Sequence, residues 1–186
     1  MSIPEVNLRP MVDADRAFLR ELYGTTRAAE MALLPWPQAA IDAFLDQQFQ
    51  AQHDYYQAQF ADAGFFVIEA AGERIGRACL QWTDSHVQFI DMALLPAWRG
   101  RGIGSRLLGQ WLARADERGL SAGLHVTADN PALRLYQRCG FQVVGENGLS
   151  LKMSRPASIA AIDATGEPRY PRGPELQTIF HADRQF

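Results

Sequence analysis

A run rich in glycine and arginine, Arg99-Gly100-Arg101-Gly102-Ile103-Gly104, joins an apolar stretch to a helical pattern. The apolar stretch, residues 87–95, predicts a strand, and residues 105–118 have helical periodicity. A glycine-rich turn between a strand and a helix exposes backbone N–H groups that can surround a phosphate. Glycine permits close approach of the main chain and a positive φ. The run therefore predicts an anion site, to which Arg99 and Arg101 add positive charge.

Three kinds of phosphate-binding turn can be compared with this run. A P-loop needs a lysine after its last glycine, and none follows here. A dinucleotide fingerprint needs a third glycine where Ser105 stands, and an acidic residue about twenty positions on, which no second strand supplies. The remaining pattern, R-x-x-G-x-G, is satisfied by Arg99, Gly102 and Gly104.

A second motif lies about thirty residues further on. Residues 130–141 read Asn-Pro-Ala-Leu-Arg-Leu-Tyr-Gln-Arg-Cys-Gly-Phe. With R-x-x-G-x-G, this block resembles the paired signature of the GNAT superfamily of acyl-CoA-dependent N-acyltransferases, although many members have one more residue between the asparagine and the alanine. The resemblance covers roughly residues 7–154. It implies an N-acetyltransferase that moves an acetyl group from acetyl-CoA to a primary amine by direct transfer in a ternary complex.

The resemblance also implies a set of acyl-CoA-binding residues. Backbone N–H groups of the turn would hold the pyrophosphate, and a backbone N–H near residues 92–94 would polarise the acyl carbonyl. The predicted set is Met92, Ala93, Leu94, Arg99, Gly100, Arg101, Gly102, Ile103, Gly104, Ser105, Arg106, Asn130 and Tyr136.

Acyl transfer to an amine also needs a proton donor for the leaving thiolate and a neutral attacking amine. Tyr136 occupies the position of the superfamily's usual general acid, and a phenol suits a thiolate; the alternative is a tyrosine packed in the core. His125 and Asp91 compete as general base. Two alternatives remain: a chain of water molecules accepts the proton without a single base, or both side chains have purely structural roles.

Acceptor recognition is expected from the segment before and within the second helix and from the last hairpin. Candidate acceptor-lining residues are Glu30, Trp36, Tyr55 and Tyr56, with core packing as the alternative for the aromatic side chains. The acceptor would be a small-molecule amine or a protein amine.

The order of predicted elements indicates an α/β fold. A helix ending near Gly24 and a second beginning near Gln38 are followed by strands and helices in the order expected for a GNAT-like three-layer sandwich. The resemblance implies a mixed sheet that is splayed centrally, between strands ending near Leu94 and Val126. Residues 1–154 would form the N-acyltransferase domain. Residues 155–186 would be a linker and an apolar tail, docked over the acceptor cleft or, preferably, onto a second subunit of a homodimer.

Bulk properties exclude several other classes. A net charge of −3 gives no support for nucleic-acid binding, and no apolar run is long enough to span a membrane. The two cysteines, Cys79 and Cys139, lack metal-ligand spacing, so no metal site and a reduced cytoplasmic protein are expected. Two rivals remain open: a catalytically inactive acyl-CoA-binding protein of the same fold, and a nucleotide-binding protein that uses the same turn.

Overall fold

The structure is a computed structural model, and it describes residues 5–158. The first half contains β1 (Asn7–Pro10), the 3-10 turn η1 (Asp13–Asp15), α1 (Arg16–Met31), α2 (Gln38–Gln59), β2 (Gly64–Ala70) and β3 (Glu73–Trp82). The second half contains β4 (His86–Leu94), η2 (Pro96–Trp98), α3 (Ile103–Glu117), β5 (Ser121–Thr127), α4 (Leu133–Arg138), β6 (Gln142–Asn147) and β7 (Ser150–Arg155). The predicted apolar tail lies outside the described residues.

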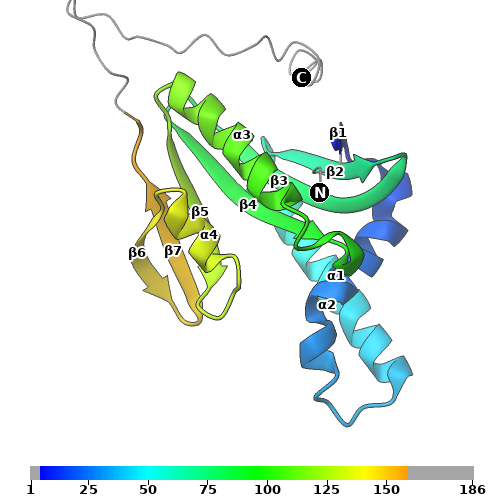
Figure 1. Cartoon of the computed structure of the whole chain (residues 1–186). Helices are drawn as coiled ribbons and strands as arrows, with labels where there is room; N and C mark the ends of the chain where they lie inside the picture. Colours follow the sequence, from blue (N-terminus) through cyan, green and yellow to red (C-terminus); the bar gives the residue numbers. More distant parts are fainter. Residues whose placement is uncertain (1–4, 159–186) are drawn as a thin grey trace, which may run out of the picture. The chain divides into compact units, whose positions relative to one another are not determined.

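The seven strands form one sheet in the order β1-β2-β3-β4-β5-β7-β6 (Figure 1). β4 and β5 pair in parallel, whereas β1 with β2, β5 with β7, and β6 with β7 pair antiparallel. The sheet is therefore mixed, which confirms the predicted α/β class. The parallel register between β4 and β5 runs from His86↔Ser121 to Phe89↔Leu124, although β4 continues to Leu94 and β5 to Thr127.

The chain divides into two compact units. The first holds the described residues up to Cys79 together with Asp91–Arg101, and the second holds Leu80–Ile90 together with the described residues from Gly102 onward. β3 and β4 contribute residues to both units. The sequence did not predict this division.

The core of the first unit lies where α1 and α2 pack on each other and on β2. These helices run side by side in Figure 1, in blue and cyan. The buried side chains are Phe18, Leu19, Leu22, Tyr23, Met31, Leu45, Phe49 and Val67. The expected end of the first helix near Gly24 is wrong, because α1 continues to Met31. Gly24 lies inside α1, where an added Cβ would meet Leu45 Cδ1 of α2 only at an ordinary contact distance of 3.9 Å.

The core of the second unit lies between α3 and the strands β5 and β7. α3 buries one face, and β7 lies between β5 and β6 (Figure 1). The largest fully buried side chains here are those of Leu80, Val87, Ile103, Leu108, Leu120 and Met153. Arg155, expected to begin the linker, is instead the last residue of β7 and forms a bidentate ion pair with Asp116 of α3, at 2.6 and 2.8 Å.

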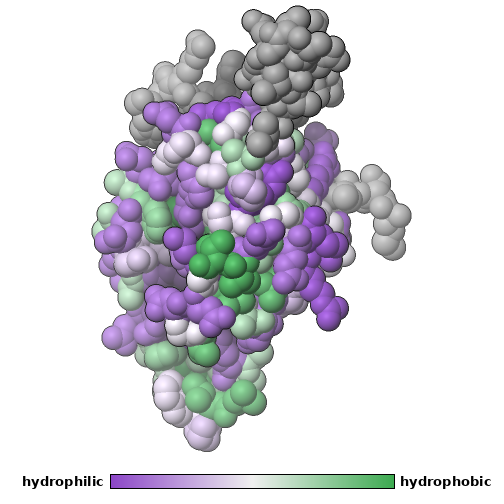
Figure 2. All heavy atoms as spheres, turned by 90° about the vertical axis from the view of Figure 1, so that its left-hand side faces the viewer, coloured by the Kyte–Doolittle hydropathy of each residue, from purple (hydrophilic) through white to green (hydrophobic). Residues whose placement is uncertain are grey.

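The β6–β7 hairpin leaves apolar side chains in solvent. Val143 and Val144 of β6 are 45% and 57% exposed, and Leu149 at the turn is 86% exposed. Figure 2 views the molecule from the side on which β6 lies, and apolar surface (green) is interspersed there with polar surface (purple). β6 is also the last strand of the sheet order, so one of its edges carries no strand among the described residues.

Candidate functional site

The glycine turn has the backbone conformation that glycine requires. Gly100 and Gly102 have φ values of +70° and +79°, in the left-handed region that side chains disfavour. Gly102 is the N-cap residue of α3, and its carbonyl oxygen accepts the first helical hydrogen bond from the N–H of Arg106 at 2.9 Å. The N–H groups just after the cap have no acceptor within the helix. The turn therefore presents donors at the positive end of a helix of 15 residues.

The two arginines of the turn contact their own chain. Arg99 Nε donates to the carbonyl oxygen of Leu94 at 2.8 Å, and Arg99 Nη2 donates to Thr25 Oγ1 at 3.0 Å. The Arg101 guanidinium lies 5.0 Å from the ring centroid of Trp98. These contacts tie the turn to the end of β4 and to α1. A guanidinium has five N–H donors, so these bonds leave others available to an anion.

The last residues of β4 lie unusually close to β3. A Cβ added at Gly76 of β3 would overlap the carbonyl oxygen of Ala93 and lie 2.7 Å from Leu94 Cδ2. The N–H of Leu95 donates to the carbonyl oxygen of Ile75 at 2.8 Å. The segment predicted to polarise the acyl carbonyl, residues 92–94, is thus fixed on its β3 side by a glycine and a backbone hydrogen bond.

Asp91, a candidate base, is ion-paired. Its Oδ2 accepts from Arg77 Nε of β3 at 2.5 Å, and Arg77 Nη2 donates to Gln52 Oε1 of α2 at 2.7 Å. The Arg77 side chain is 8% exposed and that of Asp91 23%. Three elements of the first unit therefore meet at one nearly buried guanidinium. This arrangement suits holding β4 in place, because the carboxylate oxygen nearest Arg77 already accepts a charge-assisted hydrogen bond.

Arg77 and Gln52 were not anticipated as members of the site. The available signal was an arginine inside the apolar strand pattern Ile75 to Leu80, which implies a buried partner for the charge. The identity of that partner depends on strand register and helix packing. A short sequence motif predicts neither the register nor the packing.

Tyr136, the candidate acid, lies on α4 in the second unit. Its ring contacts that of Phe141, with centroids 6.0 Å apart, and Phe141 contacts Phe89 of β4 at 6.2 Å. The carbonyl oxygen of Tyr136 accepts from the N–H of Phe141 at 3.1 Å. The Tyr136 ring thus packs against one aromatic neighbour, Phe141, while the residue as a whole is only half-buried.

The two other predicted residues of this unit differ in their surroundings. His125 is an exposed residue of β5, opposite Lys152 of β7 in the antiparallel register. Asn130 lies before α4, where its Oδ1 accepts from the N–H of Ala132 at 2.8 Å. The Asn130 side chain therefore stabilises the turn into α4.

The structure does not bring the four candidate acceptor residues together. Glu30 pairs with Arg27 one turn earlier in α1, and Trp36, 44% exposed, packs edge-on against Phe44. Tyr55 and Tyr56 lie near the other end of α2, about 25 Å further along its axis at 1.5 Å per residue. Burial raises the pKa of Tyr56, and the nearby charge of Asp91 raises it further. Tyr56 thus belongs to the surroundings of the Arg77–Asp91 pair.

Neither cysteine takes part in a metal centre within the described residues. Burial, with a further effect from Asp91, raises the pKa of Cys79 to about 12, and Cys139 is only partly buried. No group of three or more His, Cys, Asp or Glu side chains that could hold a metal ion occurs between residues 5 and 158. Over the same span, no helix has the length and apolar character needed to cross a membrane.

Comparison with known proteins identifies the class to which this fold and turn belong. Residues 27–141 match the Acetyltransferase (GNAT) family, and this segment covers more than half of the chain. The chain therefore belongs to the GNAT acetyltransferase family, as the two motifs predicted.

Individual relatives support the same class. The chain is 38% identical over 113 residues to the N-alpha-acetyltransferase RimI of Mycobacterium tuberculosis, which corresponds to 60% of this chain and 64% of that protein. Its fold is similar to that of the PaiA N-acetyltransferase of Thermoplasma acidophilum, solved in complex with coenzyme A (TM-score 0.61, 18% identity, 82% of this chain and 99% of that one). It is also similar to that of spermidine N-acetyltransferase from Vibrio cholerae, solved with CoA and spermine (TM-score 0.55, 22% identity, 82% and 96%).

Proposed function

We propose that this protein transfers the acetyl group of acetyl-CoA to a primary amine by direct transfer within a ternary complex. The observation that carries the proposal is the left-handed turn at Gly100 and Gly102, which follows β4 and η2 and opens α3 with N–H donors that have no acceptor within the helix. Such a turn fits a pyrophosphate. Arg99 and Arg101, at the same turn, supply positive charge beside it.

The short pairing between β4 and β5 suits the rest of the co-substrate. The parallel register of β4 and β5 ends at Phe89 and Leu124, before either strand ends. Backbone groups beyond these residues need other hydrogen-bond partners. The amide groups of the extended pantetheine arm provide such partners. The N–H groups of residues 92–94 then polarise the acyl carbonyl, where a main-chain donor is worth several kcal/mol.

The transfer step divides the proton chemistry between two side chains of the second unit. The amine nitrogen forms a bond to the acyl carbon, the C–S bond breaks, and the leaving thiolate takes the phenol proton of Tyr136. His125 removes a proton from the amine. His125 is preferred over Asp91 because it is exposed, whereas Asp91 is paired with the buried Arg77.

The acceptor is an amine on a protein or a small molecule. The relative from M. tuberculosis is named as an N-alpha-acetyltransferase, and the V. cholerae structure contains spermine, so the family accommodates both kinds. Glu30, Trp36, Tyr55 and Tyr56 remain candidate contacts; Glu30 lies in the last turn of α1, and Trp36 lies in the connection between α1 and α2.

The proposal is tested by measuring CoA release from acetyl-CoA across a panel of primary amines. Tyr136→Phe should keep acetyl-CoA affinity and lower kcat by about 10²-fold or more, because only the proton donor is lost. Tyr23→Phe, which removes a hydroxyl from a core tyrosine of α1, is the matched control. Acetyl-CoA binding without turnover on any amine would favour the inactive binding protein, and wild-type kcat in Tyr136→Phe would return Tyr136 to a packing role.

The base is tested by pH–rate profiles. His125→Gln should flatten the acid limb, because the group that must lose its proton is gone. Asp91→Asn should leave the shape of the profile unchanged. The opposite pattern would assign the base to Asp91, and unchanged profiles in both variants would point to solvent.

A further inference from the structure

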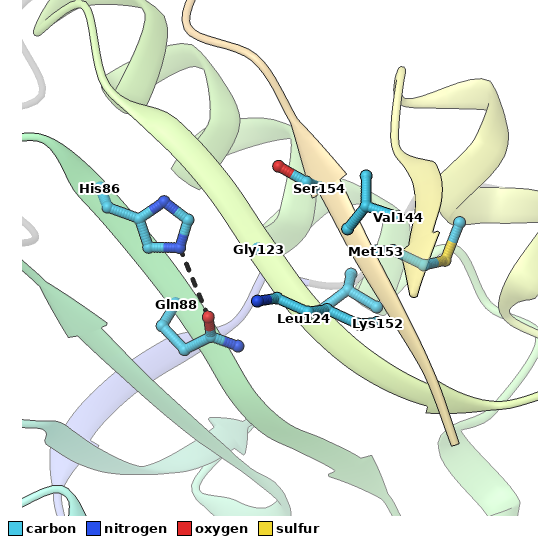
Figure 3. A pocket seen from close by; sticks show the side chains of 8 residues that line it. All are labelled: His86, Gln88, Gly123, Leu124, Val144, Lys152, Met153 and Ser154. Carbon is cyan, nitrogen blue, oxygen red and sulfur yellow. Dashed lines mark hydrogen bonds between the residues drawn. The ribbon is translucent and has the colours of Figure 1, made fainter. Parts of the chain in front are cut away.

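An open groove lies on the sheet of the second unit, apart from the residues assigned to acetyl transfer. Its volume is about 400 Å³, within the range of small-ligand sites. Figure 3 shows the side chains that line it: His86 and Gln88 from β4, Gly123 from β5, Val144 from β6, and Lys152 and Ser154 from β7. We call it the β5 groove, because β5 forms its floor.

Side-chain alternation explains why polar groups gather here. Antiparallel pairing sets Ser154 opposite Gly123 and Lys152 opposite His125, so these residues share one face of the sheet. Val144 is the extra residue where the β6–β7 register shifts between Val143 and Gly145. Such a bulge redirects one side chain, and here Val144 lines the groove.

His86 is held in a network that places donors in the groove. Ser121 Oγ donates to the carbonyl oxygen of Ser85 at 3.1 Å, so it accepts from His86 Nδ1 at 2.8 Å. Gln88 Nε2 donates to the carbonyl oxygen of Phe89, which leaves Gln88 Oε1 facing His86 Nε2 at 3.4 Å. Nδ1 of His86 is therefore a donor, and its Nε2 lies at the groove beside the amide of Gln88.

Gly123 makes room for this network. A Cβ on Gly123 would lie 2.8 Å from His86 Nε2 and 3.0 Å from Gln88 Oε1. Both distances are too short for ordinary contact. The absence of a side chain on β5 therefore lets the His86 and Gln88 side chains lie over the strand.

Lys152 supplies the positive charge of the groove, and it is unusual in this chain. The sequence contains 17 arginines and a single lysine, which is Lys152. Its side chain extends from β7 across β5 toward Gln88 in Figure 3. No ion pair of Lys152 is found within residues 5–158, and none of the eight residues that line the groove is acidic. The groove thus gathers N–H and O–H donors and positive charge without a carboxylate to neutralise it.

We propose that the β5 groove is a binding site for an anionic group, a carboxylate or a phosphate, held by Lys152 and the hydroxyl of Ser154, with His86 forming the wall beside them. The anion is either part of the amine acceptor or a separate small anion that regulates the enzyme. Both sources present the same acceptor oxygens to the same donors. Binding to the groove does not depend on the proposed acetyl transfer, whereas the distinction between the two sources does.

The single lysine permits a direct binding test. Reductive methylation with ¹³C-formaldehyde keeps the positive charge and labels only Lys152 and the α-amino group. Titration with inorganic phosphate and with succinate should shift the Lys152 methyl signal saturably, with half-saturation in roughly the millimolar range. The α-amino signal should respond only as it does to sodium chloride at equal ionic strength. Equal, linear drift of both signals in all three salts would overturn the proposal.

Two variants test the geometry while Lys152 remains the reporter. His86→Gln replaces the imidazole that forms one wall of the groove, and Gly123→Ala displaces His86 and Gln88. Each should raise the half-saturating anion concentration about 3- to 10-fold, as expected when one hydrogen-bonded contact of the site is lost. Gly109→Ala is the matched control, because a Cβ there meets nothing within 4 Å. Unchanged affinity in folded His86→Gln and Gly123→Ala would refute the assignment.

Kinetics then identify the source of the anion. Acceptor peptides that differ only by Glu against Gln are compared in wild type, Lys152→Gln and Lys152→Arg. If the anion belongs to the acceptor, Lys152→Gln lowers kcat/KM about 3- to 10-fold for the Glu peptide alone, and Lys152→Arg restores it. If the anion is separate, phosphate changes the rate on the Gln peptide in wild type but not in Lys152→Gln. Failure of acetyl transfer itself would leave the binding titration intact.

Discussion

Replacing Asp91 by asparagine should destabilise the protein strongly, whether or not Asp91 takes part in catalysis. Arg77 is 8% exposed, and its guanidinium bonds to Asp91 at 2.5 Å and to Gln52 at 2.7 Å. Asp91→Asn keeps the shape but leaves a nearly buried cation with only a neutral amide partner. Removing one member of a buried ion pair costs about 3–5 kcal/mol, and the partial exposure of Asp91 favours about 3 kcal/mol.

This magnitude is measurable by urea unfolding at pH 7. For a protein of this size, a loss of about 3 kcal/mol corresponds to a fall in Tm of roughly 6–12 °C. The urea midpoint should decrease with an unchanged m-value. A loss below about 0.5 kcal/mol would show that the pair is solvated and that the reasoning from burial is wrong.

A double variant separates the charge from the packing. Arg77→Met with Asp91→Leu removes both charges and keeps apolar volume, so it should be more stable than either Arg77→Met or Asp91→Leu alone. The coupling free energy from this cycle should exceed about 1 kcal/mol, as expected for groups in direct contact. Additive effects would mean that the two side chains act independently, contrary to the contact observed.

Three further predictions concern the backbone, the cysteines and the response to acid. Gly76→Ala should destabilise the protein by about 1–3 kcal/mol in urea unfolding, because the new Cβ meets the main chain of β4. Gly109→Ala, on the exposed face of α3, should instead stabilise the protein by about 0.5–1 kcal/mol. Equal effects of the two substitutions would contradict the close approach of β3 and β4. Iodoacetamide at pH 8 should modify Cys139 well before Cys79. Burial raises the pKa of the Cys79 thiol to about 12, and the thiolate is the reactive form. Peptide mapping that shows Cys79 modified first would refute this prediction. The hydrogen bonds from Arg9 hold the pKa of Asp15 well below its usual value. The unfolded state therefore binds a proton at Asp15 more readily than the folded state does. The stability that the pair contributes is complete above about pH 5 and is lost as the pH falls through and below 4. Asp15→Asn should therefore lower the free energy of unfolding by about 3 kcal/mol at pH 7. Between pH 5 and pH 2 the variant should lose less stability than the wild type does. An unchanged acid dependence would show that other carboxylates control the loss of stability in acid.

The family and the glycine turn could be predicted because their signals are local. Gly100 and Gly102 adopt positive φ within a single turn, and the helix begins at the next residue. Strand and helix order followed from periodicity in the same way. The error at Gly24 arose because a glycine can also lie inside a helix, and α1 continues beyond it to Met31.

The contacts of Asp91 could not be predicted from the sequence. Its partner Arg77 lies fourteen residues away and Gln52 a further twenty-five, on a different strand and a helix. Their meeting depends on the register of β3 against β4 and on the rotation of α2. An acidic residue among apolar neighbours suggested catalysis equally well, and only the three-dimensional contact separates a paired carboxylate from a free one.

This difference between local and distant signals has a functional consequence. Acyl-CoA recognition, as proposed, uses main-chain N–H groups at the α3 N-terminus and beside Ala93, so it depends on backbone conformation that short motifs specify. Acceptor recognition must use side chains from separate elements, whose positions no motif specifies. If the anion bound in the β5 groove belongs to the acceptor, Lys152→Gln should therefore alter the choice of acceptor without changing acetyl-CoA affinity. Substitution of Gly102 should do the reverse, because a side chain there strains the turn itself.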